Sequence, residues 1–153
     1  MKIDYKKLII SILIPLLLGT LVGLLTSSSN DYSVMINPSF APPGYLFPIV
    51  WTILYILMGI SSYIVSESLS DGVDNALKIY FIQLIVNLLW SFIFFTFELY
   101  FLAFLWIVLL IILVIIMIVK FYKIDKLSAY LQIPYLIWLI FAAILNFAIF
   151  LLN

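Results

Sequence analysis

Five long runs of apolar residues constrain this chain more than any other feature of its sequence. An apolar run of about 18 residues or more can cross the hydrocarbon core of a bilayer as a helix. Backbone polar groups in lipid must be satisfied within the segment, so we expect five transmembrane helices. The predicted fold class is all-α, an integral membrane bundle formed by residues 1–153 as a single domain. The runs lie at about residues 8–26, 46–66, 77–97, 100–119 and 128–152.

The composition agrees with a membrane protein and excludes several classes of function. Of the 153 residues, 67% are hydrophobic and 9% are charged, which is more apolar surface than a soluble domain of this length can bury. The net charge is zero and no basic tract is present, so no nucleic-acid partner is expected. The absence of Cys and His removes disulfides, thiol nucleophiles and the usual zinc and haem ligands. We therefore predict no metal site.

The lysines predict the orientation of the bundle. With five spans, all seven cations fall on the same side of the membrane, and the positive-inside rule identifies that side as the cytoplasm. The N-terminus is then cytoplasmic, whereas the C-terminus lies outside. No small-x-small cleavage signal follows the first run, so we expect it to be retained as a span. The cations are Lys2, Lys6, Lys7, Lys78, Lys120, Lys123 and Lys126.

Polar and aromatic residues share one face in three of the spans. A spacing of three or four residues places them on one side of a helix. Amides in a membrane need partners, so these faces are predicted to point into the bundle. The fourth span has no such stripe and is expected to be the most exposed to lipid. The stripes are Phe47, Trp51, Tyr55, Met58 and Ser62; Gln83, Asn87, Trp90, Ser91, Phe94 and Glu98; and Tyr135, Trp138, Ala142 and Asn146.

The depth of three tryptophans in their helices predicts a shared cavity. Trp51 lies about one to two turns below the outer surface on a descending helix. Trp90 lies in the outer half of its helix and Trp138 near the middle, both on rising helices. Three indoles can therefore line one cavity. The alternative, ordinary membrane aromatics, stays open on the residues alone, and it suits Trp106 best because Trp collects at membrane interfaces.

The loop of residues 27–45 is the longest connection in the chain and is predicted to lie outside, above that cavity. Pro38, Pro42 and Pro43 fix φ and stiffen it. Connections of this length in a compact bundle are often functional, so we predict a lid over the cavity; a purely structural link is the alternative. Glu98 is interpreted as a turn residue between the third and fourth spans rather than as an acid catalyst.

Two features allow more than one interpretation. Gly19 and Gly23 form a GxxxG element, which permits close helix approach either at a homodimer seam or within the monomer. Asn87 suits a contact to a ligand and equally a hydrogen bond between helices.

The order of these motifs resembles the TspO/MBR family, called tryptophan-rich sensory protein in bacteria and translocator protein in mitochondria. The resemblance covers nearly the whole chain. Three departures are visible: Asp31 stands where the family often has Trp, Asn37 replaces a basic residue, and the last helix lacks the terminal element associated with sterol binding. The residues that carry the resemblance are Pro38, Pro42, Pro43, Phe47, Trp51, Leu54, Tyr55, Gly59, Gln83, Asn87, Trp90, Ser91, Phe94, Phe95, Pro134, Tyr135, Leu136, Trp138, Phe141, Ala142, Leu145 and Asn146.

The resemblance implies a pocket for porphyrins such as protoporphyrin IX and for benzodiazepine-type drugs. It also implies a homodimer, a place in the bacterial plasma membrane, and light-dependent breakdown of the bound porphyrin. Trp51 and Trp138 are the predicted redox-active residues. The ligand-binding residues that it implies are Tyr32, Pro42, Phe47, Trp51, Asn87, Trp90, Trp138, Ala142 and Asn146.

Two functions remain open at this point, and so does the question of whether the protein is an enzyme. The first is a porphyrin-binding protein in which Trp51 and Trp138 support photo-oxidative degradation. The second is a transporter of porphyrins or other small lipophiles, or a non-catalytic sensor of such ligands. Transport favours broken helices near the midplane and internal repeats. Only Pro15 interrupts a span well within it and no repeat is seen, so the sequence favours the first function.

Overall fold

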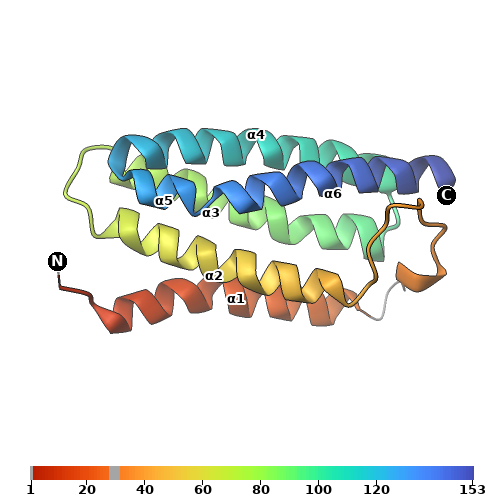
Figure 1. Cartoon of the computed structure of the whole chain (residues 1–153), viewed down its shortest axis with the longest axis horizontal. Helices are drawn as coiled ribbons and strands as arrows, with labels where there is room; N and C mark the ends of the chain where they lie inside the picture. Colours follow the sequence, from red (N-terminus) through yellow and green to blue (C-terminus); the bar gives the residue numbers. More distant parts are fainter. Residues whose placement is uncertain (1, 28–31) are drawn as a thin grey trace.

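The computed structural model describes residues 2–27 and 32–153, and within these ranges every regular element is a helix (Figure 1). Five of the helical segments are long and apolar enough to cross a membrane. The predicted all-α bundle of five spans is therefore confirmed. The elements are α1 (Tyr5–Thr26), η1 (Tyr32–Val34), α2 (Leu46–Ser66), α3 (Val73–Ser91), η2 (Phe92–Thr96), α4 (Tyr100–Ile124), α5 (Lys126–Tyr130) and α6 (Ile133–Leu152).

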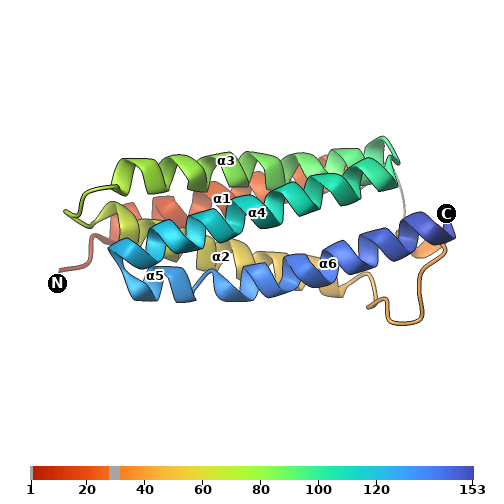
Figure 2. The same cartoon turned by 90° about the horizontal axis from the view of Figure 1, so that it is seen from above.

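The spans run side by side, and the two chain ends lie at opposite ends of the bundle (Figures 1 and 2). The N-terminus, the α2–α3 connection and the α4–α5 junction share one end. Every lysine lies in or next to these segments, so we call this the lysine end. The C-terminus, the α3–α4 turn and the segment that precedes α2 lie at the other end, which we call the loop end.

The helices extend further than the apolar runs from which they were predicted. The first begins at Tyr5, the third at Val73, and the fourth continues to Ile124. The extra turns are at the lysine end and contain the charged residues that limit the apolar runs. Such residues are good helix formers, and long lysine side chains can reach the membrane interface from them.

The fifth span is not the single helix expected over residues 128–152. It consists of α5 and α6, separated by a turn at Leu131 and Gln132. Pro134 lies in the first turn of α6 and has no N–H to bond to the preceding turn, so a continuous ladder of hydrogen bonds cannot form there. Asp125 begins α5 by accepting a hydrogen bond from the Ser128 N–H at 3.0 Å.

The third span changes its winding at the loop end. The Phe97 N–H bonds to the Phe92 carbonyl at 2.9 Å, a step of five residues that makes η2 a π-helical turn. Glu98 follows with a φ of 54°, in the left-handed region, and the chain then turns into α4. The interpretation of Glu98 as a turn residue is confirmed.

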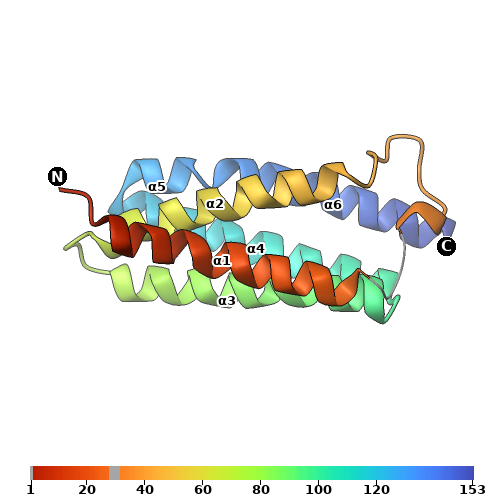
Figure 3. The same cartoon turned by 90° about the horizontal axis from the view of Figure 1, so that it is seen from below.

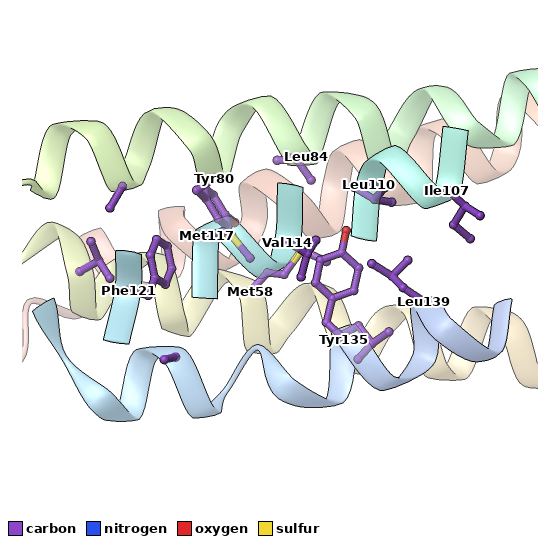
Figure 4. Packing of buried hydrophobic residues seen from close by; sticks show 14 of the residues in the cluster. Met58, Tyr80, Leu84, Ile107, Leu110, Val114, Met117, Phe121, Tyr135 and Leu139 are labelled. Atoms are coloured by element: carbon purple, nitrogen blue, oxygen red, sulfur yellow. The ribbon is translucent and has the colours of Figure 1, made fainter. Parts of the chain in front are cut away.

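The core contains side chains from α2, α3, α4, α5 and α6, whereas α1 packs on the outside of the bundle (Figures 3 and 4). Within the most apolar 18-residue stretch of each helix, 6% of α1 is buried, compared with 28% of α4. The expectation that the fourth span is the most exposed is therefore wrong. α1 nevertheless lies close to α2, because Gly59 leaves room for the α1 backbone at Ser11 and Ile12.

The two glycines of the GxxxG element differ in their surroundings. A methyl group at Gly19 would lie 2.2 Å from the Tyr55 ring, so Gly19 permits close packing within the monomer. A methyl group at Gly23 would meet nothing within 4 Å. Gly19 therefore permits close packing of α1 against α2 within the monomer, whereas Gly23 is exposed and makes no such contact.

Candidate ligand pocket

A cavity of about 720 Å³ lies in the loop-end half of the bundle. Ligand pockets commonly have volumes of about 300–1,000 Å³. The walls come from α1, α2, α3, α4 and α6, together with residues of η1 and η2. Most of its lining is aliphatic or aromatic; the amides of Asn87 and Asn146 come from α3 and α6, and hydroxyl groups of Thr and Ser come from α1, α2 and α3.

All of the predicted ligand-binding residues except Pro42 line this cavity. Pro42 instead accepts a hydrogen bond through its carbonyl from the Tyr32 hydroxyl at 3.1 Å. The Tyr32 ring lies edge-on to Phe47 with a centroid distance of 5.0 Å. Burial raises the pKa of the Tyr32 phenol, which therefore stays a neutral donor. The lining members of the predicted set are Tyr32, Phe47, Trp51, Asn87, Trp90, Trp138, Ala142 and Asn146.

Three indoles from three helices line the same space, as the helix faces predict. Trp51 comes from α2, Trp90 from α3 and Trp138 from α6. Trp51 is held against the rings of Tyr55 and Tyr135, with centroid distances of 5.5 Å and 6.2 Å. These contacts hold the Trp51 ring at the wall of the cavity.

The indole N–H groups of Trp90 and Trp138 differ in their bonding. Trp90 donates to Asn146 Oδ1 at 3.0 Å, and Asn146 Nδ2 donates to the Tyr100 carbonyl at 2.9 Å. The Trp138 nitrogen is buried and has no hydrogen-bond partner, although its ring contacts Phe47 and Phe141. A ligand with an acceptor near Trp138 can therefore form a bond that the protein alone does not make.

The floor of the cavity is a chain of hydrogen bonds that crosses the bundle. The Tyr55 hydroxyl donates to Asn87 Oδ1 at 2.8 Å, and Asn87 Nδ2 donates to the Tyr135 hydroxyl at 2.8 Å. Tyr135 in turn donates to Gln83 Oε1 at 2.7 Å. Figure 4 shows the Tyr135 hydroxyl directed from α6 toward α3. Asn87 therefore joins three helices as well as lining the cavity, so both interpretations of this residue are compatible with the structure.

The loop predicted as a lid is described from residue 32 onward; residues 28–31, including Asp31, lie outside the described residues. Its described part packs over the loop end of α6 and η2. Met35 is buried in a cluster with Phe94 and Leu145, and the Phe40 ring lies 6.4 Å from that of Phe141. This position suits a lid, and movement of the loop remains a prediction.

The sequence reasoning missed the contribution of α1 to the cavity. Gly19 and Thr20 of α1 line the cavity, as do their neighbours on that face. The GxxxG element of Gly19 and Gly23 was the available signal, but it was interpreted only as a packing element. Trp106, interpreted as an ordinary membrane aromatic, does not line the cavity, and its indole N–H donates to the Val86 carbonyl of α3 at 2.8 Å.

No group of three or more His, Cys, Asp or Glu side chains that could hold a metal occurs in residues 2–27 and 32–153. The side chains that line the cavity supply aromatic rings, amides, phenols and aliphatic hydroxyls. Such a site can bind a flat apolar ligand and orient it by a small number of hydrogen bonds.

Comparisons with known proteins agree with the sequence motifs. A model of the TspO/MBR family matches residues 11–152. The chain is 40% identical over 149 residues to a tryptophan-rich protein TspO of Archaeoglobus fulgidus, an alignment that covers 96% of this chain and 97% of that protein. It is 38% identical over 133 residues to the protein CrtK of Rhodobacter capsulatus, covering 86% and 83% of the two chains. It is 33% identical over 121 residues to the human translocator protein, covering 77% and 72%.

Proposed function

Because this chain belongs to the TspO/MBR family, we propose that it binds a porphyrin such as protoporphyrin IX within a bacterial plasma membrane. The observation that carries the proposal is the meeting of Trp51, Trp90 and Trp138, from three different helices, around one cavity. Planar aromatic ligands stack on indoles, and each contact contributes about 0.5–1.5 kcal/mol beyond the buried area. Flat aromatic drugs of benzodiazepine type fit the same description.

The polar groups of the cavity favour one orientation of the bound porphyrin. Trp138 has a buried N–H without a partner, so an unprotonated ring nitrogen of the porphyrin can accept from it. The lysines lie at the opposite end of the bundle, so no cation is available to neutralise propionates deep in the cavity. The propionates therefore stay hydrated at the loop end, while the ring occupies the aromatic part.

Bound porphyrin also makes a photochemical reaction available. An excited porphyrin is an oxidant, and tryptophan is the most readily oxidised side chain in this cavity. In the proposed step, one electron passes from the indole of Trp51 or Trp138 to the excited porphyrin, which gives a porphyrin radical anion and an indole radical cation. Dioxygen then adds to the porphyrin radical anion, and one electron returns from this adduct to the indole radical cation, which restores the tryptophan. The neutral dioxygen adduct breaks its O–O bond and one C–C bond of the macrocycle, so the ring opens with both oxygen atoms retained as two carbonyl groups. This activity would make the protein a light-dependent enzyme of porphyrin degradation.

A transporter or a non-catalytic sensor of porphyrins or other lipophiles is the alternative. The break between α5 and α6 lies toward the lysine end rather than near the midplane, so the described helices do not resemble the broken helices of transporters. Directional uptake of porphyrin into proteoliposomes, coupled to an ion gradient, would favour the transporter. A homodimer, as in the family, is part of either proposal.

Binding is tested in the dark with the purified chain in nanodiscs. Protoporphyrin IX should quench tryptophan fluorescence in a saturable manner. Trp138→Phe keeps an aromatic ring but loses the donor, so its affinity should fall about fivefold, the equivalent of one hydrogen bond of about 1 kcal/mol. Trp106→Phe is the matched control, because Trp106 does not line the cavity. Equal affinities of the wild-type chain, Trp138→Phe and Trp106→Phe for protoporphyrin IX would contradict the proposed binding position of the ligand.

The photochemistry is tested on the same complexes under illumination. The loss of porphyrin absorbance should be slow in a Trp51→Phe/Trp138→Phe variant and normal in Trp106→Phe, once each is saturated with porphyrin. If the double variant bleaches the porphyrin at the wild-type rate, the indoles have no redox role. Binding without bleaching in the wild-type protein would instead favour the sensor.

A further inference from the structure

A second, smaller hollow lies at the lysine end of the bundle, far along the helices from the porphyrin cavity. Its volume is about 310 Å³, and it lies between the end of α4 and the segment α5–α6. Its walls are mainly apolar, and several of its residues have exposed side chains, such as Val119 at 50% and Tyr130 at 56%. We call it the α4–α5 groove. It is lined by Ile118, Val119, Tyr122, Lys123, Ala129, Tyr130 and Ile133.

The groove follows from the break in the fifth span. α5 ends at Tyr130 and α6 begins at Ile133, so this stretch does not cover the side of α4 as a continuous helix would. Tyr122 and Tyr130 border the hollow, with ring centroids 6.2 Å apart. The side chain of Ala129 is small, which leaves room between the helices. The break in the fifth span and the small side chain of Ala129 therefore leave a recess on this side of the bundle.

Lysines surround the groove on the side away from the bundle centre. Lys123 is one of the lining residues, and the Lys126 ammonium lies 5.6 Å from the centroid of the Tyr122 ring. Lys120 lies three residues before Lys123 on the same helix. Asp125 is the one acidic residue in the stretch 118–133 that contains the groove, and its carboxylate already accepts the hydrogen bond from Ser128 that caps α5. The local charge is therefore positive.

The position of the groove decides which ligand can reach it. Its apolar walls belong to two spans of the membrane, so its opening faces acyl chains. Lysine side chains at the end of a span extend toward the interface, where lipid phosphates lie. An apolar recess that ends at two or three lysines matches a molecule with a hydrocarbon tail and an anionic head.

We propose that the α4–α5 groove binds an anionic phospholipid. One acyl chain lies in the recess against Val119 and Ile133, and the phosphate meets Lys123 and Lys126. The site is separate from the porphyrin cavity and does not depend on the proposed function. It adds a lipid-specific contact at the lysine end, where the broken fifth span would otherwise leave a recess.

The charge contribution is tested by native mass spectrometry of the protein with added phosphatidylglycerol or phosphatidylcholine. The wild-type chain should bind one phosphatidylglycerol in preference to phosphatidylcholine. Each lysine near an anionic lipid contributes about fivefold in affinity, so Lys123→Gln/Lys126→Gln should reduce the preference by about 25-fold or abolish it. The matched control Lys2→Gln/Lys78→Gln removes the same charge from the same end and should leave the preference unchanged. An equal loss in both variants would show a diffuse charge effect and overturn the proposed site.

The recess itself is tested by filling it without changing its charge. Val119→Trp puts an indole into the groove, whereas Ile112→Trp puts an indole at an exposed position on α4 outside the groove. Both side chains face outward, with exposures of 50% and 51%, so both variants should fold. Only Val119→Trp should lose the tightly bound phosphatidylglycerol. Retention of that lipid by Val119→Trp, or equal binding of the two lipids by the wild-type chain, would contradict the proposal.

Discussion

Gly59 fixes how closely α1 approaches the rest of the bundle, and Gly59→Ala tests that contact. An added Cβ would lie 2.4 Å from the Ile12 Cα, 2.7 Å from the Ser11 carbonyl oxygen and 2.8 Å from the Ile12 nitrogen. All three atoms belong to the backbone of α1, so no side-chain rotation can relieve the clash. Ordinary contact begins at 3.4 Å. α1 must therefore move away from α2 by about 1 Å, a shift of the kind that accompanies overpacking.

The energetic consequence follows from the packing of α1. Overpacking a well-filled contact costs about 1–3 kcal/mol. Against this, Ala exceeds Gly in helix propensity by up to about 1 kcal/mol. Gly23→Ala isolates that second effect, because its methyl group meets nothing within 4 Å. We expect Gly59→Ala to be destabilised by about 1–3 kcal/mol relative to Gly23→Ala. Since α1 forms a wall of the cavity, Gly59→Ala should also weaken the binding of protoporphyrin.

The assay is equilibrium unfolding in mixed micelles with increasing dodecyl sulfate, followed by helical circular dichroism. Gly19→Ala completes the series: its methyl group would lie 2.2 Å from the Tyr55 side chain, which can rotate, so its cost should be intermediate. The expected order of stability is Gly23→Ala, then Gly19→Ala, then Gly59→Ala. If Gly59→Ala unfolds at the same dodecyl sulfate concentration as Gly23→Ala, α1 does not contact α2 through its backbone and the reasoning is wrong.

Substitutions at three further positions test single structural features by the same unfolding assay. Asn87→Leu leaves two buried tyrosine hydroxyls short of a partner and should cost about 1–3 kcal/mol; a neutral result would contradict the hydrogen-bond chain. Glu98→Gly should stabilise the chain by about 1 kcal/mol, because φ is 54° there and glycine adopts it without strain, whereas Glu98→Ala should give no gain. Trp106→Phe loses the bond to the Val86 carbonyl and should cost about 1 kcal/mol without changing porphyrin affinity.

Several features could be predicted because they depend on residues close together in the chain. The five spans follow from the lengths of the apolar runs. The inward faces of α2, α3 and α6 follow from helical periodicity, which is why Trp51, Trp90 and Trp138 could be assigned to one cavity. The glutamate at the α3–α4 turn was equally readable, since a charged residue between two apolar runs marks the end of a span.

Other features required knowledge of which segments are neighbours. The sequence gives no measure of how much of α1 is covered, so its exposure and its place in the cavity wall were missed. The pairing of Trp90 with Asn146, which leaves Trp138 with the free donor, depends on side chains 56 residues apart along the chain. The α4–α5 groove also exists only because a break in one helix lies beside an intact one. Hydropathy and periodicity are local properties of a chain, whereas contacts between helices depend on distances that only the packed bundle defines.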